Sequence, residues 1–194
     1  MVKAFSKDKN LHSYVIGLAL GDGNISRDSK WRTSRLRITC DKKYPYLYKY
    51  IKLCLEQLLP DNKVSISDNN TYLNVYCYSN RLESLLGWKG NMGSKYKQQV
   101  RVPMWITKNK EYTKECLRGL IQTDGSIFFD RKYKMVNFVT QIPNLAHDVL
   151  ALMRQIGYTP NMQILAIKDN KTKFTIRISK DVDKFIKDIK LWKS

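Results

Sequence analysis

The chain has 194 residues, 43% of them hydrophobic and 27% charged, a composition that indicates a folded globular protein rather than a disordered or fibrous one. No apolar run approaches the roughly 18 residues of a membrane span, and the basic N-terminus lacks the apolar stretch of a secretion signal, so we expect an intracellular protein without a membrane partner, in a prokaryotic cytoplasm or an organelle. Its 35 Lys and Arg against 17 Asp and Glu give a net charge of +18, divided equally between residues 1–100 and 101–194, which predicts a polyanionic partner bound by the folded body.

The elements predicted for the first half begin with a helix that is apolar on almost every side, from Val15 to Leu20, and is therefore buried. Polar and apolar residues then alternate, which predicts half-buried strands. The segments that follow are strand Arg35–Cys40, helix Tyr46–Leu59, hairpin strands Lys63–Ser67 and Thr71–Ser79, and short helix Asn80–Leu86. Gly87 closes this unit, and the Gly and Pro residues that follow mark residues 88–110 as a linker.

The second half repeats this order. Its predicted segments are strand Lys134–Ile142, helix Leu145–Ile156, hairpin strands Met162–Ile167 and Lys173–Ser179 across the turn Asp169–Asn170, and helix Asp181–Leu191. The segment Tyr14–Ile25 also resembles Cys116–Ile127, with their Asp-Gly pairs 102 positions apart. We therefore predict an α+β protein of two tandem repeats, residues 1–87 and 111–194, joined by the linker.

Small residues share one face of each repeated helix. They are Gly17 and Gly21 in the first copy, and Gly119 and Thr123 in the second. Because small residues at this spacing let two helix backbones approach closely, we expect these helices to pack on each other where the repeats meet.

Each repeated helix ends in an acid followed by glycine, Asp22 in one copy and Asp124 in the other. A carboxylate there faces the negative end of the helix dipole, at a cost of about 0.3–1 kcal/mol, and closely crossed helices would also bring the two acids together. A divalent cation would reverse both penalties, and oxygen ligands suit Mg²⁺. Asp-Gly alone is a common turn signal, but two copies in register favour a metal site. Two His and four well-separated Cys offer little for a zinc site or a Ser-His-Asp triad.

The segments Val15–Gly23 and Leu117–Gly125 resemble the LAGLIDADG motif of homing endonucleases, with conservative replacements. The resemblance covers nearly the whole chain and implies tandem αββαββα units with pseudo-twofold symmetry, whose two antiparallel sheets form a DNA-binding saddle. It implies an intron-encoded, monomeric meganuclease that cuts a long pseudo-palindromic site in double-stranded DNA across the minor groove, leaving short 3′ overhangs. The metal ligands would be Asp22 and Asp124 with the carbonyls of Gly21 and Thr123. Mg²⁺ would be the cofactor, Mn²⁺ could substitute, and Ca²⁺ would support binding without cleavage.

Two further catalytic positions follow from the same resemblance. Family members often place a Gln at the end of the second strand, where Gln141 fits, while the first half offers Cys40 and departs from the pattern. A Lys commonly precedes a Pro and the second motif, which makes Lys95 the first candidate and Lys97 the second. Such a Lys could organise the attacking water or offset phosphate charge, and its second-half equivalent would be Lys190 or Lys193.

Alternate strand residues face the same side of a sheet, and polar faces of this kind can enter the major groove of DNA. The predicted DNA contacts are Asn24, Ser26, Arg35, Arg37, Thr39, Tyr72, Asn74, Tyr76, Ser126, Lys134, Thr140, Lys173, Thr175 and Arg177. Val136 and Phe138 interrupt this alternation in the second half.

Two other functions fit the same sequence. An RNA-binding intron maturase would use the same scaffold and could keep its acids without using them. A non-catalytic DNA-binding protein, such as a repressor, is favoured by loss of an acid, and here both acids are present. An intein-embedded nuclease would need splicing segments for which 194 residues leave no room.

Overall fold

A computed structural model describes residues 6–27, 30, 33–167 and 171–193. The first repeat contains α1 (Lys9–Leu20), β1 (Gly23–Ser26), β2 (Ser34–Asp41), α2 (Pro45–Leu58), β3 (Val64–Asp68), β4 (Tyr72–Ser79) and α3 (Leu82–Leu86). The second contains α6 (Lys110–Asp124), β5 (Gly125–Asp130), β6 (Tyr133–Thr140), α7 (Pro143–Gln155), β7 (Asn161–Ile167), β8 (Lys171–Ile178) and α8 (Val182–Asp188). The predicted turn Asp169–Asn170 lies outside the described residues. No helix within the described ranges has the length and hydrophobicity that crossing a bilayer requires.

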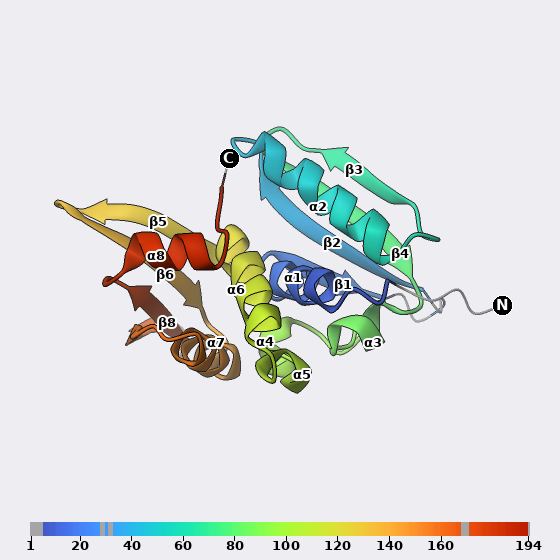
Figure 1. Cartoon of the computed structure of the whole chain (residues 1–194). Coiled ribbons are helices and arrows are strands. Elements are labelled where there is room, and N and C mark those ends of the chain that lie inside the picture. The colour runs from blue at the N-terminus through green and yellow to red at the C-terminus, as the bar shows by residue number, and fades with distance from the viewer. Residues whose placement is uncertain (1–5, 28–29, 31–32, 168–170, 194) are drawn as a thin grey trace.

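The two sheets have the same topology. Their antiparallel strand orders are β1-β2-β4-β3 and β5-β6-β8-β7, and they lie on either side of the central pair α1 and α6 (Figure 1). Helices α2 and α7 pack on corresponding strands of the two sheets. The predicted duplicated α+β fold is therefore confirmed, and the short strands β1 and β5 join each motif helix to its sheet.

The repeats meet through helix backbones. A Cβ atom added at Gly17 would collide with the carbonyl oxygen of Cys116, and one added at Gly119 would lie 2.7 Å from the backbone nitrogen of Leu18. Only glycine permits this approach, which is why the small-residue faces predicted from the sequence are the ones in contact. The ends of α1 and α6 are thereby fixed relative to each other.

The connection between the repeats is well packed rather than a free tether. It contains α4 (Lys95–Gln98) and α5 (Met104–Thr107), and it buries Trp88, Val100, Val102 and Ile106. Hydrophobic burial of this kind fixes the path of a connecting segment.

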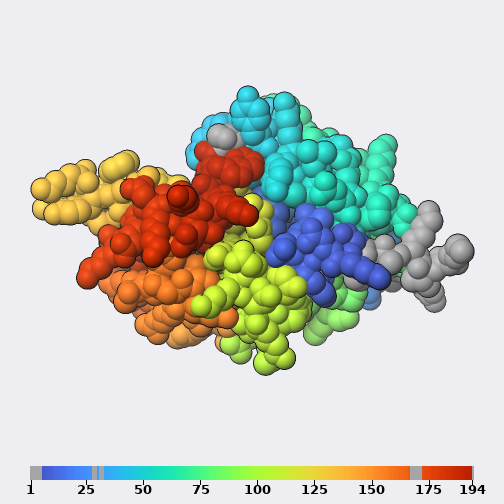
Figure 2. Space-filling model, viewed as in Figure 1, coloured from blue at the N-terminus to red at the C-terminus, as the bar shows by residue number. Residues whose placement is uncertain are grey.

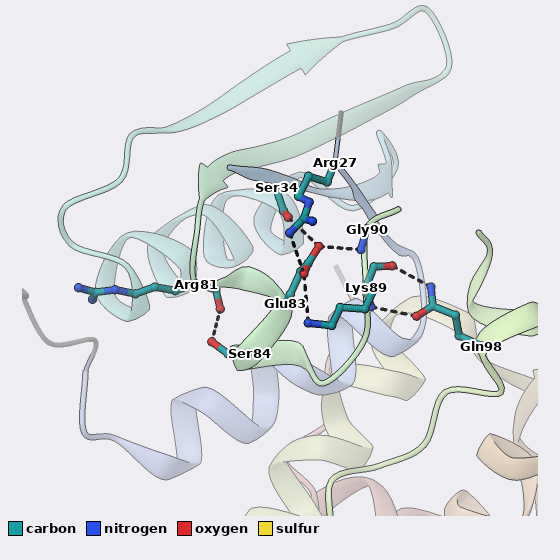
Figure 3. Close-up of polar contacts among 8 residues, drawn as sticks. All are labelled: Arg27, Ser34, Arg81, Glu83, Ser84, Lys89, Gly90 and Gln98. Carbon is teal, nitrogen blue, oxygen red and sulfur yellow. Dashed lines mark hydrogen bonds and ion pairs between the residues drawn. The ribbon is translucent and has the colours of Figure 1, made fainter. Parts of the chain in front are cut away.

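A carboxylate in α3 holds the start of this connection. Glu83 is hydrogen-bonded or ion-paired at 3.0–3.4 Å with residues of three other segments, namely Arg27, Ser34, Lys89 and Gly90 (Figure 3). The side chain of Gln98 continues the network, because it donates to the carbonyl of Lys89 at 2.8 Å and accepts from the N–H of Lys89 at 2.9 Å. These bonds hold α4, and with it Lys95, against the first repeat.

Candidate active site

The two motif acids meet at the ends of α1 and α6. Gly21 caps α1, and a Cβ atom built on Gly21 would lie 3.6 Å from the carboxyl carbon of Asp124. The side chains of Asp22 and Asp124 are hydrogen-bonded to each other. Burial and the neighbouring charge of Asp22 raise the pKa of Asp124 to about 7, although Lys95 and Lys193 oppose the rise. The close helix crossing therefore brings together two acids that repel each other when both are ionised.

A lysine satisfies the free carbonyls at each of these two helix ends. Lys95 Nζ donates to the carbonyls of Ala19 at 3.2 Å, Leu20 at 2.7 Å and Gly21. A cation there complements the negative end of the helix dipole. Burial lowers the pKa of Lys95, while Asp124 and Asp22 oppose this shift. Lys97, the second candidate from the sequence, is exposed on α4.

The C-terminal Lys193 takes the corresponding place at the end of α6. Its Nζ donates to the carbonyl of Gly125 at 2.9 Å and to that of Thr123 at 3.4 Å. Burial lowers the pKa of Lys193, and the charges of Asp22 and Asp124 act against this. Lys190 is exposed. Of the two second-half candidates, the structure thus places Lys193 beside the acids.

Two hollows flank the acid pair. The first, about 460 Å³, is lined by residues that include Asp22, Thr39, Asp41, Lys43 and Lys193. The second, about 600 Å³, is lined by residues that include Asn24, Lys95, Asp124, Gln141 and Lys173. Each hollow therefore combines one acid with one lysine, as a site with two related reaction centres would require.

The strand register changes one assignment made from the sequence. Gly23 pairs with Ile38 and the equivalent Gly125 pairs with Phe138, so Gln141, three residues after Phe138, corresponds to Asp41. Cys40 is not its counterpart. Cys40 is buried on the core side of β2, where burial and the charge of Asp22 raise its thiol pKa to about 12. The sequence could not show this, because the two strands can be aligned equally well one residue out of register.

The open face of the first sheet carries all eight of its predicted DNA contacts. The alternation of β2 is regular, with Leu36, Ile38 and Cys40 buried and the intervening residues partly exposed. Pairing across the sheet places on that open face Asn24, Ser26, Arg35, Arg37, Thr39, Tyr72, Asn74 and Tyr76. Thr39 Oγ1 donates to Asn74 Oδ1 at 3.0 Å, and a hollow of about 300 Å³ is lined by side chains that include both arginines.

The second sheet departs from the prediction at two positions. Val136 and Phe138 are fully buried, so Lys134 and Thr140, at even spacing from them, also face the helices. Lys134 Nζ pairs with Asp183 of α8 at 2.6 Å. Thr140 Oγ1 accepts from the N–H of Ile142 at 3.2 Å. These two residues therefore lie away from the open face.

The open face of this sheet includes residues that sequence reasoning missed. Strand pairing places on it Ser126, Met135, Asn137, Val139, Lys173, Thr175 and Arg177. Arg177 Nε donates to Asn137 Oδ1 at 3.1 Å. The buried pair Val136 and Phe138 was the signal that could have identified Asn137, because it fixes which set of alternate residues faces the core.

Comparison with known proteins agrees with this architecture. Residues 111–190 match the family model of the LAGLIDADG-like domain. No curated protein sequence gives a significant match. Among solved structures, I-DmoI in complex with DNA and Mn has a TM-score of 0.67 at 17% sequence identity, covering 93% of this chain and 96% of that chain. The N-terminal LAGLIDADG domain of DUF199/WhiA has a TM-score of 0.63 at 15% identity, covering 98% and 88%.

The fold and the helix-borne acid pair therefore define a protein built from two LAGLIDADG repeats, and the second repeat is a LAGLIDADG-like domain. Over nearly its whole length the chain has the fold of I-DmoI, a homing endonuclease. The same fold occurs in the DUF199/WhiA domain, so the fold does not by itself determine whether the acids cut DNA.

Proposed function

We propose that the chain is a metal-dependent endonuclease that cleaves specific sites in double-stranded DNA, with residues 1–87 and 111–194 as its two repeats. The observation that carries this proposal is the pairing of Asp22 with Asp124, each accompanied by a lysine in its own hollow. An arrangement that only joined two repeats would not need to hold two acids together against their repulsion. A DNA substrate also implies an intracellular protein, in the cytoplasm of a prokaryote or in an organelle.

The groups around the acid pair fit a hard divalent cation. Across the described ranges no three His, Cys, Asp or Glu side chains form a metal-binding cluster. The donors would be the carboxylates of Asp22 and Asp124 with the carbonyls of Gly21 and Thr123. Oxygen donors of this kind favour Mg²⁺, with Mn²⁺ as a substitute and Ca²⁺ supporting binding alone. I-DmoI has been solved with its DNA and Mn, Mg or Ca. Bound there, the cation would neutralise the acids and polarise the scissile phosphate.

The remaining groups have separate tasks in each hollow. Lys95 beside Asp124 and Lys193 beside Asp22 would offset the negative charge that develops on the phosphate. Gln141, in the same hollow as Lys95, would orient the attacking water. Asp41 takes the corresponding place in the other hollow, so the two strands would be cut in chemically different surroundings.

The open faces of the two sheets would bind the DNA. Arg and Asn side chains, such as Arg37 and Asn74, suit bidentate contacts to base edges in the major groove. The net charge of +18 would drive binding through counterion release. Two pseudo-symmetric repeats in one monomeric chain suit a long, pseudo-palindromic target.

Selection of cleaved sites tests this function. DNA from a randomised pool is incubated with the chain and Mg²⁺, cut molecules are sequenced, and binding is measured separately in Ca²⁺. Asp22→Asn and Asp124→Asn should bind the selected site and fail to cut it. The matched control Asp183→Asn, which changes an exposed acid on α8, should cut normally.

Three results would contradict the proposal. Full cutting by both motif variants would remove the metal assignment. Specific DNA binding by the wild type without cutting would indicate a non-catalytic DNA-binding protein. Preferential binding of structured RNA would indicate a maturase.

A further inference from the structure

The C-terminal segment leaves the second repeat and ends against the first (Figures 1 and 2). It turns after α8, where Lys190 has a φ of 51° and the N–H of Leu191 donates to the carbonyl of Ile186 at 2.8 Å. The Trp192 ring then packs edge-on against Tyr50 of α2, with 5.4 Å between centroids. Lys193 Nζ lies 5.2 Å from the centre of the Tyr44 ring. The position of Lys193 thus depends on how this segment is held.

One buried amide holds the segment by its backbone. Gln122 of α6 is 1% exposed, and its Nε2 donates to the carbonyl of Trp192 at 2.7 Å. Its Oε1 accepts from the hydroxyl of Tyr14 of α1 at 2.6 Å. Both ends of the amide are therefore used, and a buried polar group that loses its partner costs about 1–3 kcal/mol. The alternative amide orientation would present an acceptor to a carbonyl, so the chain Tyr14–Gln122–Trp192 has one direction.

The ring of Tyr14 is also fixed from outside this chain. The Arg118 guanidinium lies 4.3 Å from the centre of the Tyr14 ring and is ion-paired with Glu115. Tyr14 and Tyr50 pack with 5.6 Å between centroids, so Trp192, Tyr50 and Tyr14 form a continuous aromatic group. A hydrogen-bond chain whose members cannot rotate transmits a fixed position to its last member.

The other active-site lysine has separate support. Lys95 lies at the start of α4, which is held by Gln98 through its bonds to Lys89 and to the carbonyl of Gly93 at 2.9 Å. The structure gives no contact that joins the Gln98 network to the Gln122 chain. A change at Gln122 should therefore affect Lys193 and leave Lys95 in place.

We propose that Gln122 is a positioning residue for Lys193, so that cleavage of one DNA strand depends on Gln122 and cleavage of the other strand does not. The proposal about strands rests on the nuclease function proposed above. The proposal about position can be tested without any cleavage.

Hydrogen exchange of the metal-free protein tests the position. Gln122→Leu keeps the size of the side chain and removes both bonds, and it should speed exchange at least about tenfold in the peptide that contains Leu191 and Trp192. The matched control Gln155→Leu removes an amide of α7 that donates to the carbonyl of Thr107 at 2.6 Å, and it should leave this peptide unchanged. Unchanged exchange in Gln122→Leu would overturn the proposal whether or not the chain cuts DNA.

Strand-resolved cleavage tests the consequence. A selected target is labelled with a different fluorophore on each strand, and single-turnover rates are measured for both. Gln122→Leu should slow the same strand as Lys193→Met, by roughly tenfold to hundredfold, because small displacements of a catalytic group have effects of this size. The double variant should be no slower than Lys193→Met, and Lys95→Met should slow the opposite strand.

Equal slowing of both strands by Gln122→Leu, or effects that multiply in the double variant, would overturn the proposal. If Gln122→Leu does not fold, Tyr14→Phe removes only the hydroxyl that holds the amide. It should slow the same strand by a smaller factor, and no strand preference there would count against the proposal. Absence of any cleavage by the wild type would contradict the nuclease function and leave the exchange measurement to decide the role of Gln122.

Discussion

Replacing Asp124 by Asn should stabilise the metal-free protein. The folded state holds Asp124 against Asp22, and its pKa is raised from 3.8 to about 7 by burial and by that neighbouring charge. Because the folded pKa lies above the unfolded one, the folded state binds more protons between about pH 4 and pH 7. The stability of the wild type should therefore fall as the pH rises through this window. Asn keeps the shape of the side chain and carries no charge.

The size of the effect follows from the pKa shift. A rise from 3.8 to about 7 corresponds to roughly 4 kcal/mol at full strength, since one pKa unit is about 1.4 kcal/mol. Solvent at the exposed Asp22 screens the repulsion, so we expect about 2 kcal/mol in favour of Asp124→Asn near pH 8 and less near pH 5.

Urea unfolding with a chelator at these two pH values measures the difference. Addition of Mg²⁺ should stabilise the wild type and not the variant. Asp183→Asn, at an exposed ion pair, should change the stability little at either pH. A variant less stable than the wild type near pH 8, or a difference that grows toward pH 5, would refute the electrostatic reasoning.

Three further substitutions have defined outcomes. Gly119→Ala should destabilise the protein by about 3 kcal/mol or more in urea unfolding, because its Cβ would lie 2.7 Å from the backbone nitrogen of Leu18 and the helices would have to separate; wild-type stability would show that the helix contact can relax. Glu83→Gln should cost about 1–3 kcal/mol by the same measurement, since it weakens the bonds that join α3 to the connection between the repeats. Asn74→Ala should weaken DNA binding in Ca²⁺ about tenfold or more, whereas Lys134→Ala, on the helix side of its sheet, should change it far less; equal losses would contradict the assignment of the open faces.

The sequence predicted the parts of this molecule that depend on local pattern and internal repetition. Alternation in β2 placed Arg35 and Arg37 on the open face, and the repeated small residues predicted the contact between α1 and α6. Register between distant strands was not accessible, because shifting β6 by one residue exchanges its two faces. The misplacement of Lys134 and Thr140 and the pairing of Cys40 with Gln141 have this same cause.

Long-range contacts explain what else the sequence left open. Lys193 and Lys190 are equally plausible in a chain with 35 Lys and Arg, and only the path of the C-terminal segment separates them. That path depends on Gln122, which in sequence is an ordinary polar residue of a helix. Its partners lie 70 and 108 positions away, and no local pattern announces such contacts.

Direct backbone contact between α1 and α6 has a consequence for altering the target sequence. Asp22 and Asp124 stand at the ends of two rods that cannot slide, while the side chains proposed to read bases project from sheets beyond them. The distance between the two cuts would then be set by the protein's own frame and not by the bases it recognises. Variants selected on the sheets for new sites should all produce the same stagger between the strands.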